Sequence, residues 1–136
     1  MQRTRRVGLA AILGWAAACG YSGPTDNGGN NGPNYPNNPG GTPVLSANVS
    51  VNDNFYSPAS VNLAAGGTVT WTWVGDEGHS VTPESGTTFS PTAGVSFPPK
   101  TLQVTFASAG TYQYYCTAHG ADAYGQGAMV GSVFVQ

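Results

Sequence analysis

The chain has 136 residues, of which 40% are hydrophobic and only 7% are charged, and its formal net charge is −2. This length allows one modest domain. Three of the four basic residues lie within the first six positions, which leaves Lys100 alone against six acidic residues. We therefore expect no nucleic-acid partner, because nucleic acid requires patches of Lys and Arg, whereas a weakly acidic surface would tolerate a cationic partner.

Residues 1–18 have the pattern of a secretory signal peptide. A basic stretch precedes the apolar run 7–18, which is too short to span a bilayer. The run ends in Ala16-Ala17-Ala18-Cys19, which resembles a bacterial lipobox, although Ala16 stands where Leu is more usual. We expect Cys19 to be lipidated and to anchor the exported protein in the bacterial cell envelope, in the periplasm or at the outer membrane. The alternative is plain cleavage, which would give a soluble secreted or periplasmic protein.

Residues 20–43 consist almost wholly of Gly, Asn and Pro. A segment of this composition buries too little apolar surface to offset the entropy of the chain, so we predict a disordered tether that Pro stiffens in part. Behind a lipidated Cys19, such a tether would keep a globular head mobile near a membrane. A spacer of no particular length is the alternative.

From residue 44 to residue 136, apolar and polar residues alternate with period two, which is typical of half-buried strands. Turn signals such as Gly66-Gly67 and Pro98-Pro99 separate the runs. No segment has a helical apolar stripe with caps. We predict one all-β domain over residues 44–136, an antiparallel β-sandwich. The alternating apolar residues are Val49, Val51, Val69, Trp71, Trp73, Leu102, Val104, Phe106, Tyr112, Tyr114, Met129, Val133 and Val135.

Large aromatic residues occupy strand-like positions in this domain. Trp71 and Trp73 share one face of the same predicted strand, and Phe55 and Phe106 lie in other strands. We expect most of these four to pack in the core, and at least one of the two Trp side chains to be fully buried.

The domain is poor in soft metal donors and has four candidates, His79, Cys116, His119 and Met129. If lipid modifies Cys19, then Cys116 is unpaired in an oxidising compartment, where an unpaired Cys is reactive or ligating. Imidazole, thiolate and thioether suit copper, and two His with one Cys and a weak axial Met are typical of an electron-transfer site. Ser80 and Thr117 adjoin these residues and are either hydrogen-bonding neighbours of a metal or exposed loop residues.

Several short motifs lie at or near the four donors and in the predicted strands. They are Asp53-Asn54-Phe55 with Pro58, Gly67-Thr68-Val69-Thr70-Trp71, His79-Ser80-Val81, Gly110-Thr111-Tyr112-Gln113-Tyr114-Tyr115-Cys116, His119 and Met129-Val130-Gly131. Through these motifs the domain resembles the cupredoxins, the small blue copper proteins, and their plastocyanin-like branch most closely. The resemblance covers residues 49–135 and implies a Greek-key β-sandwich with one type 1 copper per chain. It implies His79 and His119 as imidazole ligands, Cys116 as the thiolate and Met129 as the axial thioether.

One segment departs from the family pattern. Nine residues, 120–128, separate His119 from Met129, where plastocyanin-like chains usually have only a few. Gln126 in this segment is an alternative axial ligand, since Gln serves axially in some blue copper sites. We prefer Met129 because it keeps its place relative to the last strand.

The expected function is that of a one-electron carrier that cycles between Cu(II) and Cu(I) in the cell envelope, with the exposed edge of His119 as the exit. Its partner would be a redox protein, either a cytochrome or a copper oxidoreductase. We expect a monomer that is not an enzyme, because nothing in the sequence supplies the oriented base and oxyanion hole of a cysteine hydrolase. The alternative is copper delivery or buffering with the same ligands. A structural sandwich without metal would leave Cys116 unexplained.

Overall fold

The computed structural model describes residues 35–120 and 129–136, which form eight strands and no helix. The described part of the chain therefore has no helix that is long and apolar enough to cross a membrane. The strands are β1 (Val44–Asn52), β2 (Phe55–Ser57), β3 (Ser60–Trp73), β4 (His79–Pro83), β5 (Ala93–Ser96), β6 (Thr101–Phe106), β7 (Gly110–Tyr115) and β8 (Val130–Val135).

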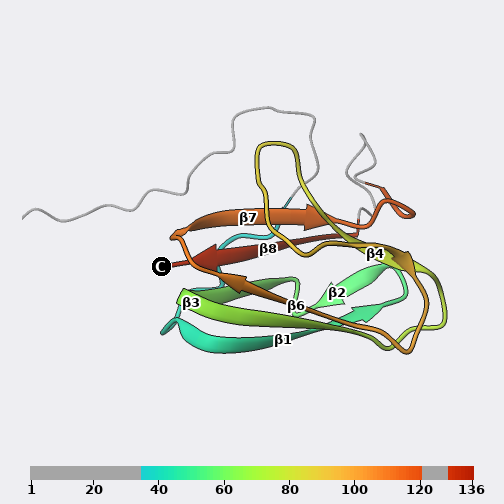
Figure 1. Ribbon diagram of the computed structural model, residues 1–136, viewed down its shortest axis with the longest axis horizontal. Helices are drawn as coiled ribbons and strands as arrows, with labels where there is room; N and C mark the ends of the chain where they lie inside the picture. Colours follow the sequence, from blue (N-terminus) through green and yellow to red (C-terminus); the bar gives the residue numbers. More distant parts are fainter. Residues whose placement is uncertain (1–34, 121–128) are drawn as a thin grey trace, which may run out of the picture.

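The strands pack as a β-sandwich, which confirms the predicted all-β fold class. Figure 1 shows β7 and β8 in one layer and β1, β3 and β6 in the other. The hydrogen-bonded strands follow the order β2-β1-β3-β8-β7-β4-β5, and β6 pairs with β3. We expected an antiparallel sheet, but the sheet is mixed, because β1 pairs with β3 and β3 pairs with β8 in parallel. Alternation predicts which face of a strand is buried, but it does not predict the direction of the neighbouring strand.

The long strand β3 joins the two layers. Its first part, residues 60–63, pairs with β8, and residues 67–72 pair with β6. The Gly66-Gly67 pair between these parts is a bend inside one strand, where the sequence predicted a turn between two strands. Gly66 has a φ of 82°, a left-handed conformation that favours glycine. A Cβ at Gly67 would lie 2.7 Å from Cγ of Leu63, so the bend also requires the absence of a side chain.

The core lies between the layers, and it contains the predicted aromatic residues with one exception. Trp71 and Trp73 are both buried, as is Phe106, whereas Phe55 is 55% exposed. Phe55 begins the short strand β2, which lies at the edge of the sheet and pairs with β1. The other buried hydrophobic residues are Val49, Val51, Tyr56, Val61, Leu63, Val69, Val81, Ala93, Leu102, Val104, Tyr114, Cys116, Met129, Val133 and Val135.

Residues 35–43, the last part of the predicted tether, contact the sandwich. The hydroxyl of Tyr35 donates a hydrogen bond to Glu84, and the side-chain amide of Asn62 donates to the carbonyl oxygen of Gly41 at 2.8 Å. Burial, followed by the bond to Glu84, raises the pKa of Tyr35. The described contacts therefore begin before the predicted domain boundary at Val44, and residues 20–34 lie outside the described part of the chain.

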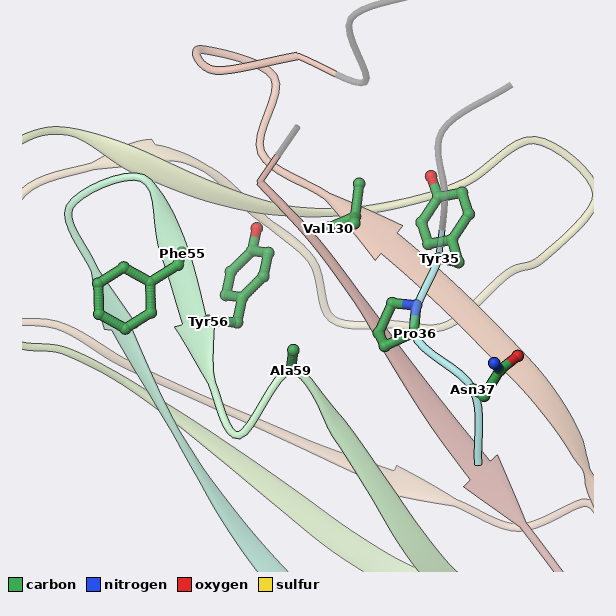
Figure 2. Close-up of a pocket in the computed structure, with 7 residues that line it drawn as sticks. All are labelled: Tyr35, Pro36, Asn37, Phe55, Tyr56, Ala59 and Val130. Atoms are coloured by element: carbon green, nitrogen blue, oxygen red, sulfur yellow. The ribbon is translucent and has the colours of Figure 1, made fainter. Parts of the chain in front are cut away.

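These residues also form one wall of a surface hollow of about 330 Å³. Figure 2 shows Tyr35 and Pro36 on one side of it and Phe55 and Tyr56 on the other. The segment before β1 is thus part of the surface of the domain. The hollow is lined by Tyr35, Pro36, Asn37, Phe55, Tyr56, Ala59 and Val130.

Candidate metal centre

Two histidines and the buried cysteine converge at one end of the sandwich. His79 begins β4, Cys116 directly follows β7, and His119 lies in the loop after it. The Nδ1 atoms of His79 and His119 are 3.1 Å apart, and the Sγ atom of Cys116 lies 3.8 Å from the first and 3.6 Å from the second. Three residues that span forty positions of sequence therefore present one donor atom each to a common point.

This triangle of donor atoms has the size that a metal ion requires. A point equidistant from three atoms at these separations lies about 2.0 Å from each, close to metal–nitrogen bonds of about 2.0–2.1 Å and slightly short of metal–sulfur bonds of about 2.3 Å. Two imidazoles and one thiolate suit copper. The residues present therefore fit a copper ion.

Cys116 is fully buried, and it has no disulfide partner among the described residues. The backbone N–H of Ser80 donates to its Sγ at 3.3 Å. The Ser80 hydroxyl also accepts a hydrogen bond from the backbone N–H of Thr117 at 2.8 Å. Ser80 and Thr117 are therefore hydrogen-bonding neighbours of the centre and not merely exposed loop residues. Together they tie β4, which begins at His79, to the loop that begins at Cys116.

Met129 lies directly opposite Cys116 across the β7–β8 pair. Tyr115 pairs with Val130, and the next residues are joined by a 2.9 Å hydrogen bond from the backbone N–H of Cys116 to the carbonyl oxygen of Met129. Directly opposite residues have Cβ atoms about 4.5–5.5 Å apart on one face of the sheet. Met129 is 1% exposed, so its side chain points into the same buried end of the sandwich. Gln126, the alternative axial residue, lies outside the described residues, as does Cys19.

The two imidazoles differ in exposure and in their outer neighbours. His79 is 1% exposed, and its carbonyl oxygen accepts a hydrogen bond from Nε1 of Trp73 at 2.9 Å. His119 is 26% exposed, and its Nε2 lies 3.5 Å from a carboxylate oxygen of Glu77. His119 is therefore the donor residue through which the centre meets the surface.

Asp53 is the neighbour of the centre that the sequence did not predict as a site residue. One of its carboxylate oxygens lies 3.1 Å from Nε2 of His79. Hydrogen bonds from the backbone N–H groups of Glu77 and Asp76, and then the contact with His79, hold the pKa of Asp53 below its usual range. The sequence contained no signal for this role, because Asp53 lies 26 positions before His79 in an Asp-Asn turn that is equally typical of an ordinary hairpin.

Comparison with known proteins agrees with this geometry. Residues 44–136 match the family described as copper binding proteins of the plastocyanin/azurin family. No curated protein matches the chain. Among solved structures, a proline-to-glycine variant of amicyanin in its reduced Cu(I) form at pH 4 is 26% identical, with a TM-score of 0.56 over 70% of this chain and 86% of that one.

A purple cupredoxin from Nitrosopumilus maritimus shares the fold, at 24% identity and a TM-score of 0.53 over 66% of this chain and 99% of that one. An oxidised methionine-to-lysine variant of amicyanin is similar at 25% identity and a TM-score of 0.56, over 67% of this chain and 82% of that one. The family match covers the whole sandwich and its donor residues, which confirms the resemblance to cupredoxins. The chain therefore belongs to the plastocyanin/azurin family of copper-binding proteins, and its cofactor is copper.

Proposed function

We propose that this protein is a type 1 copper protein that carries single electrons in the cell envelope, with His79, Cys116, His119 and an axial Met129 as ligands. The observation that carries the proposal is the triangle of two Nδ1 atoms and one Sγ atom at the end of a rigid sandwich. The copper would supply a one-electron couple between Cu(II) and Cu(I). Members of this family are in general electron carriers and not enzymes, and we propose the same here.

The hydrogen bonds around the triangle would restrain its geometry when bound copper changes oxidation state. Ser80, which follows His79 in β4, makes three hydrogen bonds to Cys116 and Thr117. Two of them come from backbone N–H groups, and the third joins the hydroxyls of Ser80 and Thr117. Because a site on packed strands and hydrogen-bonded loops moves little, the reorganisation that accompanies electron transfer stays small. The partly exposed edge of His119 is the proposed exit for the electron, since the other donor residues are buried.

Met129 is the proposed axial ligand because its position does not depend on the long loop before it. The pairing of β7 with β8 holds Met129 opposite Cys116 whatever the length of the segment between His119 and Met129. Gln126 remains the alternative, to be distinguished by mutation.

The place of action and the partner rest on the sequence. We propose that lipidation of Cys19 anchors a monomer in the periplasm or at the outer membrane, where it exchanges electrons with a cytochrome or a copper oxidoreductase. The Cys19→Ser variant would then move from the membrane fraction to the soluble fraction. An unchanged distribution would contradict lipid anchoring and favour a soluble exported protein.

Addition of Cu(II) to the purified chain tests the proposed centre. We expect an intense thiolate-to-copper charge-transfer band in the visible spectrum and a matching electron spin resonance signal. Cys116→Ser should abolish the band, and Ser108→Ala, a hydroxyl change outside the site, should leave it unchanged. Absence of an intense band in the wild-type protein would refute the proposed centre.

Copper delivery is the second candidate, because the partial exposure of His119 gives a chelator access to one ligand. Competition with a strong Cu(I) chelator separates the two functions. A carrier retains copper through repeated oxidation and reduction, whereas a delivery protein releases it readily.

A further inference from the structure

The carboxylate of Asp53 is held in a defined position beside the metal centre. It lies in the turn between β1 and β2, where Asn52 pairs with Phe55, and Asn54 adopts a left-handed φ of 68°. The turn brings the Asp53 carboxylate against the loop between β3 and β4, which leads directly into His79. The Asp53 carboxylate therefore supports the metal centre, although Asp53 lies 26 positions before His79 in the sequence.

The loop before His79 is closed around this carboxylate. The backbone N–H of Glu77 donates to Oδ1 of Asp53 at 2.9 Å, and the N–H of Asp76 donates to Oδ2 at 3.1 Å. A Cβ at Gly75 would lie 2.1 Å from Oδ1, so the loop can approach so closely only with glycine at that position. These contacts hold the carboxylate in one orientation before any metal binds.

The third group that faces the carboxylate is Nε2 of His79, 3.1 Å from Oδ1. An ionised carboxylate only accepts hydrogen bonds, and a neutral imidazole carries one N–H, so Nε2 is the nitrogen that donates to Asp53. The lone pair of His79 is then on Nδ1, the atom that faces His119 and Cys116. The carboxylate thus selects the tautomer that the proposed copper centre needs.

We propose that Asp53 is a positioning residue that orients His79, fixes its Nε2–H tautomer and, through its negative charge, stabilises Cu(II) relative to Cu(I). The effect on copper rests on the proposed function, whereas the effect on the tautomer does not. A carboxylate that accepts the second N–H of a ligating imidazole raises the basicity of that ligand, and loss of such a partner typically lowers metal affinity by about 10–100-fold.

Glu77 provides a matched control, because it places a similar charge beside the other imidazole without the same geometry. Its carboxylate is 57% exposed and lies 3.5 Å from Nε2 of His119. The backbone N–H groups of Asp76 and Glu77 donate to the carboxylate of Asp53 and not to that of Glu77. Asp53→Asn and Glu77→Gln each remove one negative charge near the centre. The contribution of orientation is therefore the difference between the two variants.

The first arm of the experiment uses the metal-free chain. Nitrogen-15 NMR at mildly alkaline pH should show His79 as the Nε2–H tautomer in the wild type and a mixture of tautomers in Asp53→Ala. Glu77→Gln should retain the wild-type pattern for His79. A wild-type His79 that carries its proton on Nδ1, or an unchanged tautomer in Asp53→Ala, would overturn the inference regardless of what copper does.

The second arm measures copper affinity by chelator competition and the reduction potential by voltammetry. We expect Asp53→Ala to bind Cu(II) about 10–100-fold more weakly, with a smaller loss for Cu(I). Each tenfold loss of Cu(II) affinity relative to Cu(I) corresponds to a rise of about 59 mV in the reduction potential. Asp53→Asn, which keeps the shape and an accepting oxygen, should shift the potential in the same direction by less than Asp53→Ala and by more than Glu77→Gln.

The outcomes separate the two proposals. If the wild-type protein has the thiolate band but Asp53→Asn and Glu77→Gln have equal potentials, the proposed effect of Asp53 on copper is wrong and the copper centre stands. If the wild-type protein lacks the band, the copper centre fails, and the tautomer measurement still decides whether Asp53 orients His79. Should Asp53→Ala not fold, Asp53→Asn is tested in both arms, since its amide oxygen preserves the shape of the turn.

Discussion

Gly131→Ala is predicted to be among the most damaging single-methyl additions in this domain. Gly131 lies in β8 directly opposite Tyr114 of β7, and the Tyr114 ring occupies the space above it. A Cβ at Gly131 would lie 2.3 Å from Cζ and 2.4 Å from the hydroxyl oxygen of Tyr114. Ordinary carbon contacts are about 3.5–4.0 Å, so the ring would have to move by more than an ångström.

The Tyr114 ring has nowhere to move. It is fully buried and makes edge contacts with Tyr56 at 4.8 Å and with Trp71 at 5.3 Å between ring centroids. Overpacking of a core typically costs about 1–3 kcal/mol, and a displaced rigid ring surrounded by other rings belongs at the upper end. We therefore expect a loss of about 3 kcal/mol in the free energy of unfolding and a fall of roughly 12–24 °C in Tm.

Urea unfolding of the metal-free chain measures the free energy of unfolding without a contribution from copper binding. The matched control is Gly94→Ala in β5, because Gly94 is an exposed strand glycine with no atom within 4 Å of the added Cβ. That control should change the free energy by no more than about 0.5 kcal/mol. Equal stability of the two variants would refute the clash. In a double-mutant cycle, Tyr114→Leu should relieve part of the cost of Gly131→Ala, and strict additivity would also contradict the explanation.

Two further predictions concern the axial ligand and the contact of Tyr35 with the sandwich. Met129→Leu should change the visible and spin-resonance spectra of the copper form while Gln126→Ala leaves them unchanged; a change confined to Gln126→Ala would make Gln126 the axial ligand. Tyr35→Phe removes the hydrogen bond to Glu84 and should lower the free energy of unfolding by about 1 kcal/mol at neutral pH. Because the folded-state pKa of Tyr35 is raised, this contribution is complete below about pH 10 and is lost progressively at higher pH. The difference in free energy of unfolding between the two proteins should therefore be full at pH 8 and smaller at pH 11. A constant difference between them would contradict the bond.

The sequence by itself determined the fold class and the chemical nature of the centre. Period-two alternation predicted the buried faces of the strands, including Trp71 and Trp73, because a strand turns its side chains to opposite faces in strict alternation. The spacing of three positions between Cys116 and His119 placed a thiolate and an imidazole in one loop, because side chains so near in sequence stay near in space. The combination of imidazole, thiolate and thioether donors then predicted copper.

The tertiary structure alone decided which distant residues meet. Period two reveals the face of a strand but neither its partner nor its direction, so the parallel pairings of β1, β3 and β8 had no signature in the sequence. The register of β7 against β8 sets Met129 opposite Cys116, although the length of the intervening loop had made that position doubtful. The contact between Asp53 and His79 depends on a turn and a loop from different strands, joined by hydrogen bonds that no spacing encodes. Donor types are a property of the residues themselves, whereas the orientation of each donor depends on long-range packing.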